Sequence, residues 1–242
     1  MYVDVLELYN FYNSRLGIFA KDSIIRVLLD IWPDVSDKSI LGLGYPLPFL
    51  ESFHGRAERI LAFMPAGQGA ISWPNQALSA TALVSEEELP LPDASIDRVL
   101  VIHSLEFLKD PSLILNEIWR ILASDGRMIV IVPNLCGMWS NMESSPFGCG
   151  KSYFLHQIIS FLEDINFTLS FTSGAMFFPP TNKVFFYKFP YLFEKVGRIL
   201  CPGFAGVYIV EVRKVIYQGL PVHKFQERRK FVPVLIPQSV LT

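Results

Sequence analysis

Apolar residues recur three or four positions apart in several separate stretches of the chain, a spacing that favours amphipathic helices. The clearest stretch follows Asp110 and Pro111, which suit the N-cap and the first position of a helix. We expect Gly17 to end the first helix, Asp22 to cap the second and Gly126 to end the helix after Asp110. The helices predicted in this way cover residues 3–13, 22–32, 49–53, 111–122, 152–164 and 190–200.

Short runs of continuous apolar residues lie between these helices. The run Val99–Ile102 is typical of a central parallel strand that is covered on both faces. Strands are predicted over residues 40–43, 60–64, 81–84, 99–102, 128–132, 167–178 and 208–217. Because strand, helix and strand follow one another within about 35 residues, each unit is expected to form a right-handed crossover. The repeated pattern predicts an α/β fold with a doubly wound, mostly parallel, seven-stranded sheet.

The length of 242 residues fits one elaborated α/β domain, since domains usually span roughly 100–200 residues. Hydrophobic residues make up 51% of the chain and charged residues 18%, which is enough apolar material for a large core. We divide the chain into a helical N-terminal cap (1–37), the α/β domain (38–218) and a C-terminal tail (219–242). The basic residues Arg228, Arg229 and Lys230 in the tail are interpreted as a solvated charge cluster.

Charge and hydropathy exclude several classes of function. A net charge of −2, without a long run of one sign, argues against a nucleic-acid-binding surface. The mean hydropathy of +0.34 is high, yet no apolar run reaches the roughly 18 residues of a membrane-spanning helix. The first residues contain acids and no basic region, so no secretory signal is expected. Cys136, Cys149 and Cys201 have no spacing typical of a zinc site, which predicts a reduced, metal-free, cytoplasmic protein.

In an open α/β sheet, ligands bind beyond the carboxyl ends of the strands. The loops of interest are therefore those after Leu43, Met64, Val84, Ile102 and Val132. The first of them begins the sequence ILGLG, which ends at Gly44. A long stretch, ELPLPDASIDRVLVIHSLEFLKDPSLILNEIWRILASDGRMIVIVPN, runs from Glu88 to Asn134.

In this order, the two motifs resemble a class I S-adenosylmethionine-dependent methyltransferase, in particular the small-molecule and quinone-type branch. The similarity extends over roughly residues 38–135, about the size of a compact α/β unit. It implies a Rossmann-like fold and S-adenosylmethionine as cofactor. The glycine-rich turn is degenerate, because Pro46 and Pro48 stand where the family resembles GxGxG, and proline removes a backbone donor. Met64 stands where the family has the acid that holds the ribose hydroxyls.

The resemblance also implies which residues contact the cofactor. Gly44 and Tyr45 lie at the glycine-rich turn, and Gln68 is a substitute for the missing ribose acid. Ser85 aligns with the acid near the adenine amino group, and we assign that contact to the adjacent Glu86. His103 follows the central strand, at the rim of the expected site, and is a weak candidate for a general base. Four of them have a structural alternative: Gly44 as a strand-to-helix turn, Tyr45 as core packing, Glu86 as a solvated acid and His103 as a hydrogen-bonded loop residue.

Acceptor substrates enter beyond the fifth strand in this family. We therefore predict substrate contacts by Phe147 and Tyr153, and by Tyr12 of the first helix, with packing of a lid as the alternative. The predicted function is methyl transfer to an unknown, small or apolar acceptor molecule. The alternative is a catalytically inactive binding or regulatory protein, since fold alone does not establish function. The aromatic segment 154–193 would suit an apolar acceptor, a partner subunit, peripheral membrane contact or simple core packing.

Overall fold

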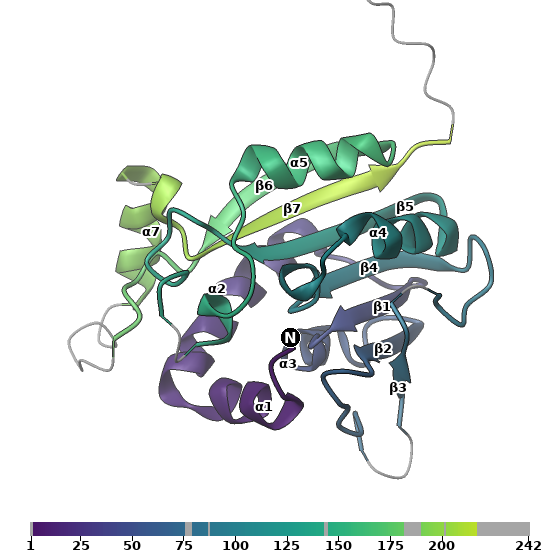
Figure 1. Ribbon diagram of the computed structural model, residues 1–242, viewed down its shortest axis with the longest axis horizontal. Helices are drawn as coiled ribbons and strands as arrows, with labels where there is room; N and C mark the ends of the chain where they lie inside the picture. Colours follow the sequence, from purple (N-terminus) through teal and green to yellow (C-terminus); the bar gives the residue numbers. More distant parts are fainter. Residues whose placement is uncertain are drawn as a thin grey trace, which may run out of the picture.

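Within the residues that the computed structural model describes, seven strands form a single sheet in the order β3-β2-β1-β4-β5-β7-β6 (Figure 1). The model describes residues 2–75, 79–86, 88–142, 145–181, 190–200 and 202–216. The strands are β1 Ser39–Gly44, β2 Arg59–Pro65, β3 Thr81–Val84, β4 Ile96–Ile102, β5 Leu122–Pro133, β6 Phe167–Ala175 and β7 Val207–Lys214.

The first five strands are parallel, and β7 pairs antiparallel with both β5 and β6. This arrangement confirms the predicted doubly wound, mostly parallel, seven-stranded sheet. The chain turns from β1 outward to β2 and β3, and then returns to the other side of β1 with β4. The carboxyl ends of β1 and β4 therefore flank the point where the strand order reverses, which is where ligands bind in open α/β sheets.

Helices cover both faces of the sheet (Figure 1). One face packs against the first three helices, and the other packs against α4 and α5. The helices are α1 Val5–Asn13, α2 Arg15–Ile31, α3 Leu47–Leu50, α4 Pro111–Ile121, α5 Leu155–Asp164 and α7 Pro190–Leu200. None of the helices in the described part of the chain is long and apolar enough to span a membrane.

The boundary between the first two helices differs from the prediction. Gly17 does not end a helix and Asp22 is not a cap, because α2 already begins at Arg15. Its N-cap is Ser14, whose hydroxyl accepts a hydrogen bond from the Gly17 amide at 3.1 Å. A Cβ at Gly17 would lie 1.9 Å from the carbonyl oxygen of Phe11. Gly17 therefore allows α2 to pack closely against the end of α1, and it does not end a helix.

Other predicted ends of helices and strands also differ from those in the structure. Gly126, expected to end a helix, lies inside β5, since α4 ends at Ile121 and strand pairing begins at the next residue with an irregularity in register. The sixth strand ends at Ala175 rather than at residue 178. The last strand ends at Lys214. The predicted tail, 219–242, lies outside the described residues.

Candidate functional site

The turn after β1 packs closely against the end of β4. Gly44 has a φ of +90°, and a Cβ there would lie 2.0 Å from the carbonyl oxygen of Ile102. The Tyr45 amide donates to that same oxygen at 2.9 Å. Only glycine combines this backbone conformation with so close an approach. Pro46 follows and packs over Gly42, where a Cβ would come within 2.4 Å of the proline ring.

Gln68 lies beneath this turn, in the loop that follows β2. Its side chain is buried, and Nε2 donates to the carbonyl oxygen of Gly44 at 3.1 Å. Its Oε1 is buried without a hydrogen-bond partner among the described atoms. Buried polar atoms are nearly always satisfied, so this acceptor is available to a donor from water or from a ligand.

His103 follows β4 and is fully buried, with a φ of +54°. Its Nδ1 lies 3.1 Å from Oε1 of Glu106, whose Oε2 accepts from the Ser104 amide at 3.1 Å. Its Nε2 lies 2.7 Å from the hydroxyl of Tyr12. With the proton assigned to Nδ1 and donated to the carboxylate, Nε2 is free to accept the hydrogen bond from Tyr12. Burial raises the pKa of Tyr12 well above its usual range, so its hydroxyl keeps the proton.

Glu86 lies in the loop after β3 and is partly buried, which differs from the alternative of a solvated acid. Its carboxylate accepts hydrogen bonds from the hydroxyl of Tyr2 and from Ser104 Oγ, the latter at 3.0 Å. Burial raises the pKa of Glu86 despite these two donors.

The N-terminal segment, residues 2–12, lies across the carboxyl ends of these strands (Figure 1). The ring of Tyr2 packs against that of Phe107 at a centroid distance of 5.4 Å. The Val5 amide donates to the carbonyl oxygen of Gln68 at 3.0 Å. Tyr12 stacks on Tyr45 at 5.8 Å with an interplanar angle of 16°. The segment thus contacts the loops after β1, β2, β3 and β4.

The structure brings the five predicted cofactor residues together around the carboxyl ends of the strands. They are Gly44, Tyr45, Gln68, Glu86 and His103. Two of the three predicted substrate residues join them, since Tyr12 contacts His103 directly and the ring of Phe147 lies 4.9 Å from the imidazole. The third, Tyr153, is buried in the other layer, where its hydroxyl donates to the Leu105 carbonyl oxygen and burial raises its pKa to about 12.

Sequence reasoning missed the part played by Tyr2 and Ser104. Tyr2 precedes the first helix and belongs to no apolar period, so nothing in the pattern marks it. Met64, at the position of the missing acid, is fully buried in the core. Trp73 is also largely buried and donates from Nε1 to Glu51 at 2.9 Å.

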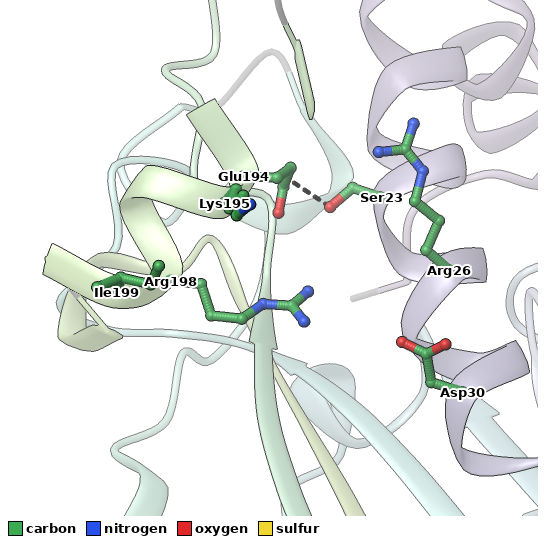
Figure 2. A pocket seen from close by; sticks show the side chains of 7 residues that line it. All are labelled: Ser23, Arg26, Asp30, Glu194, Lys195, Arg198 and Ile199. Carbon is green, nitrogen blue, oxygen red and sulfur yellow. Dashed lines mark hydrogen bonds between the residues drawn. The ribbon is translucent and has the colours of Figure 1, made fainter. Parts of the chain in front are cut away.

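Two cavities lie near the N-terminal helices. One, of about 270 Å³, is bordered by Tyr9, Tyr45, Pro48 and Trp73 beside the turn after β1. The other, of about 280 Å³, lies between α2 and α7. Figure 2 shows Glu194 of α7 at its edge, accepting a hydrogen bond from Ser23 of α2 at 2.8 Å. Of the predicted cofactor residues, Tyr45 lines the first cavity.

Comparison with known proteins agrees with the fold. A family model described as a methyltransferase domain matches residues 69–130. None of the curated proteins matches the chain in sequence.

Solved structures of S-adenosylmethionine-dependent methyltransferases superpose on most of the chain. One from Thermotoga maritima is 15% identical, covers 87% of this chain and 95% of its own, and has a TM-score of 0.61. One from Archaeoglobus fulgidus is 17% identical, covers 87% of this chain and 100% of its own, and has a TM-score of 0.57. The [4+2]-cyclase SpnF is 16% identical, covers 81% of each chain and has a TM-score of 0.56.

The chain therefore has the Rossmann-like fold of class I S-adenosylmethionine-dependent methyltransferases, as the sequence motifs predicted. The presence of a cyclase among these structures illustrates that one fold supports different reactions. The activity of this chain has to be argued from its own site.

Proposed function

We propose that this protein is an S-adenosylmethionine-dependent methyltransferase that acts on a small or apolar acceptor. The observation that carries the proposal is the buried, unpaired Oε1 of Gln68 beside Gly44. It places an unsatisfied acceptor at the switch point of the sheet, where a ribose hydroxyl would supply the donor.

The polar groups at the site fit an adenosyl ligand. Glu86 would accept a hydrogen bond from the adenine amino group, and Gln68 from a ribose hydroxyl. Gly44 and Tyr45 would border the methionine part, since the absence of a side chain at Gly44 lets a ligand approach the backbone. These residues offer fewer hydrogen-bonding groups than the family's pattern does, because Met64 provides no acceptor for the ribose. We therefore expect weaker binding than a carboxylate at position 64 would provide.

When bound, S-adenosylmethionine supplies an activated methyl group, so the protein has mainly to align the acceptor with it. His103 is suited to take a proton from an acceptor at Nε2, the atom that now faces Tyr12. Glu106 is a positioning residue, since it holds Nδ1 and the orientation of the ring. The ring of Phe147 packs against the imidazole, and the ring of Tyr45 stacks on Tyr12; these aromatic side chains favour an apolar acceptor.

Isothermal titration with S-adenosylmethionine and with S-adenosylhomocysteine tests this function. We expect both to bind, and Gln68→Ala to weaken binding by about tenfold, the effect of one hydrogen bond of roughly 1.4 kcal/mol. The matched control is Gln157→Ala on α5, which removes an amide from the opposite layer and should leave the affinity unchanged. Absence of heat with either ligand, in the wild type and in the variants, would overturn the proposal.

A second candidate is a binding or regulatory protein with a silent methyltransferase fold. It is favoured by one specific observation: the buried Tyr12 ring stacks on Tyr45 and occupies the free nitrogen of His103. The two candidates are separated by the titration above, because a silent fold that does not bind the cofactor would give no heat with either ligand.

A further inference from the structure

We infer that the N-terminal segment, residues 2–12, occupies the proposed cofactor site, and that an adenosyl ligand binds only after this segment has moved out. The inference rests on the proposed function and adds its regulation. It arises from three contacts that the segment makes with the loops assigned to ligand binding.

The first contact is made by Tyr2. Its hydroxyl donates to Glu86, the carboxylate proposed to receive the adenine amino group. Its ring packs on Phe107, and a Cβ at Gly67 would lie only 3.1 Å from Tyr2 Cδ2. A flat aromatic ring with a hydrogen-bond donor directed at Glu86 has the same recognition chemistry as adenine. Tyr2 and a purine would therefore compete for one place.

The second and third contacts lie farther along the segment. Val5 donates its amide to the Gln68 backbone and lies against Gly69. Tyr12 donates to His103 Nε2 and stacks on Tyr45. The loop after β2, which holds Gln68, is proposed to contact the ribose, and the loop after β1, which holds Tyr45, the methionine part. The docked segment thus lies against the loops that a bound ligand would contact at its adenine, ribose and methionine parts.

The segment buries Val5, Leu8 and Tyr12 in the core, but it has few backbone links to the rest of the domain. Among the described residues, one backbone hydrogen bond, from Val5 to Gln68, joins it to the sheet. Helix α1 has only nine residues, and isolated helices shorter than about 12–15 residues are marginal in water, so its order depends on docking. Its outer face is already exposed at Leu6 and Tyr9. Extended backbone at Ser14 (φ −74°, ψ 159°) separates it from α2, and the segment would turn about this residue.

A disulfide can lock the segment in place. A Cβ built at Gly69 lies 3.7 Å from Cβ of Val5, which matches the usual separation of about 3.8 Å in disulfides. The experiment compares the Val5→Cys/Gly69→Cys double variant in its oxidised and reduced forms. S-adenosylhomocysteine is titrated calorimetrically, and hydrogen exchange of residues 2–12 is followed with and without the ligand. We expect the oxidised form to bind about tenfold more weakly or worse, and the reduced form to bind with faster exchange in α1 when the ligand is present.

Three controls complete the test. The wild type treated with the same oxidant accounts for Cys136, Cys149 and Cys201. Gly69→Cys alone accounts for a side chain at a residue with φ +88°. Tyr2→Ala removes the competing ring without a lock and should strengthen binding.

The outcomes are distinct. Weak binding only in the oxidised form, together with tighter binding by Tyr2→Ala, supports the inference. Equal affinity in the oxidised and reduced forms overturns the inference and leaves the proposed function standing. Absence of binding in the wild type, the reduced variant and Tyr2→Ala overturns the proposed function, and the inference falls with it.

Discussion

The hydroxyl of Tyr12 lies 2.7 Å from Nε2 of His103, and both side chains are buried. The first helix of the chain is thereby joined to the loop after the central strand. Since the other nitrogen of the imidazole faces Glu106, the ring is held from both sides. This pair therefore fixes Tyr12 of the N-terminal segment against the imidazole ring of His103.

Tyr12→Phe keeps the ring but removes the hydroxyl from His103. Because Nε2 would remain buried without a partner, the free energy of unfolding should fall by about 1–3 kcal/mol. Urea denaturation measures the change. Tyr9→Phe is the matched control. Because the Tyr9 side chain is half exposed, loss of its hydroxyl should leave the free energy of unfolding unchanged. Equal stability of both variants would contradict a structural role for the Tyr12–His103 hydrogen bond.

Gly44→Ala should destabilise the fold strongly. The substitution adds the cost of a positive φ for an L-residue, about 1–2 kcal/mol, to a backbone clash of about 1–3 kcal/mol. Gly55→Ala separates these costs, because Gly55 has a φ of +73° and nothing within 4 Å of its Cβ position. We expect the thermal midpoint to fall much further for Gly44→Ala than for Gly55→Ala. Similar shifts would show that the turn relaxes away from β4.

The backbone at His103 also requires a tolerant residue. Its φ of +54° is accessible to asparagine and strained for a β-branched side chain. His103→Asn should therefore be more stable than His103→Val by about 1–3 kcal/mol in chemical denaturation. If His103 is the base, both variants should also lose methyl transfer while S-adenosylhomocysteine affinity in His103→Asn is retained. Equal stability of the two variants would indicate that the loop rearranges.

Glu194 predicts a pH dependence of stability. Burial raises its pKa in the folded protein, and Oε2 has no partner among the described atoms. Above the ordinary glutamate pKa the unfolded chain releases this proton first, so the folded state holds more protons and unfolding becomes easier as the pH rises towards the raised pKa. The free energy of unfolding should thus decrease over that interval.

Glu194→Gln should reduce this decrease, because the amide does not ionise, while Oε1 can still accept from Ser23. Glu86, whose pKa is also raised by burial, contributes in the same direction and remains in the variant. The control is Glu163→Gln at an exposed position of α5. Denaturation curves between about pH 4 and pH 8 measure the slope. An unchanged slope in Glu194→Gln would contradict the prediction.

Elements with a strong local signal were predicted well. The continuous apolar run of β4 and the Asp110-Pro111 start of α4 both appear as expected. Boundaries that depend on contacts between elements were not. Gly17 resembles a helix terminator in the sequence, yet its role is to let α2 approach the backbone of Phe11. A glycine in the sequence shows only that a side chain is absent. Which neighbouring element packs closely against it depends on the tertiary structure.

The sequence alone determined the order of strands and helices, and through it the sheet and the edge at which Gly44, Gln68 and His103 meet. Periodicity and turn residues act locally, so they are visible in the order of amino acids. Only the tertiary structure decided that Tyr2 and Tyr12 lie in that edge, against Glu86 and His103. These contacts join residues 84 and 91 positions apart. Such contacts depend on how the first helix docks, and no local pattern encodes that arrangement.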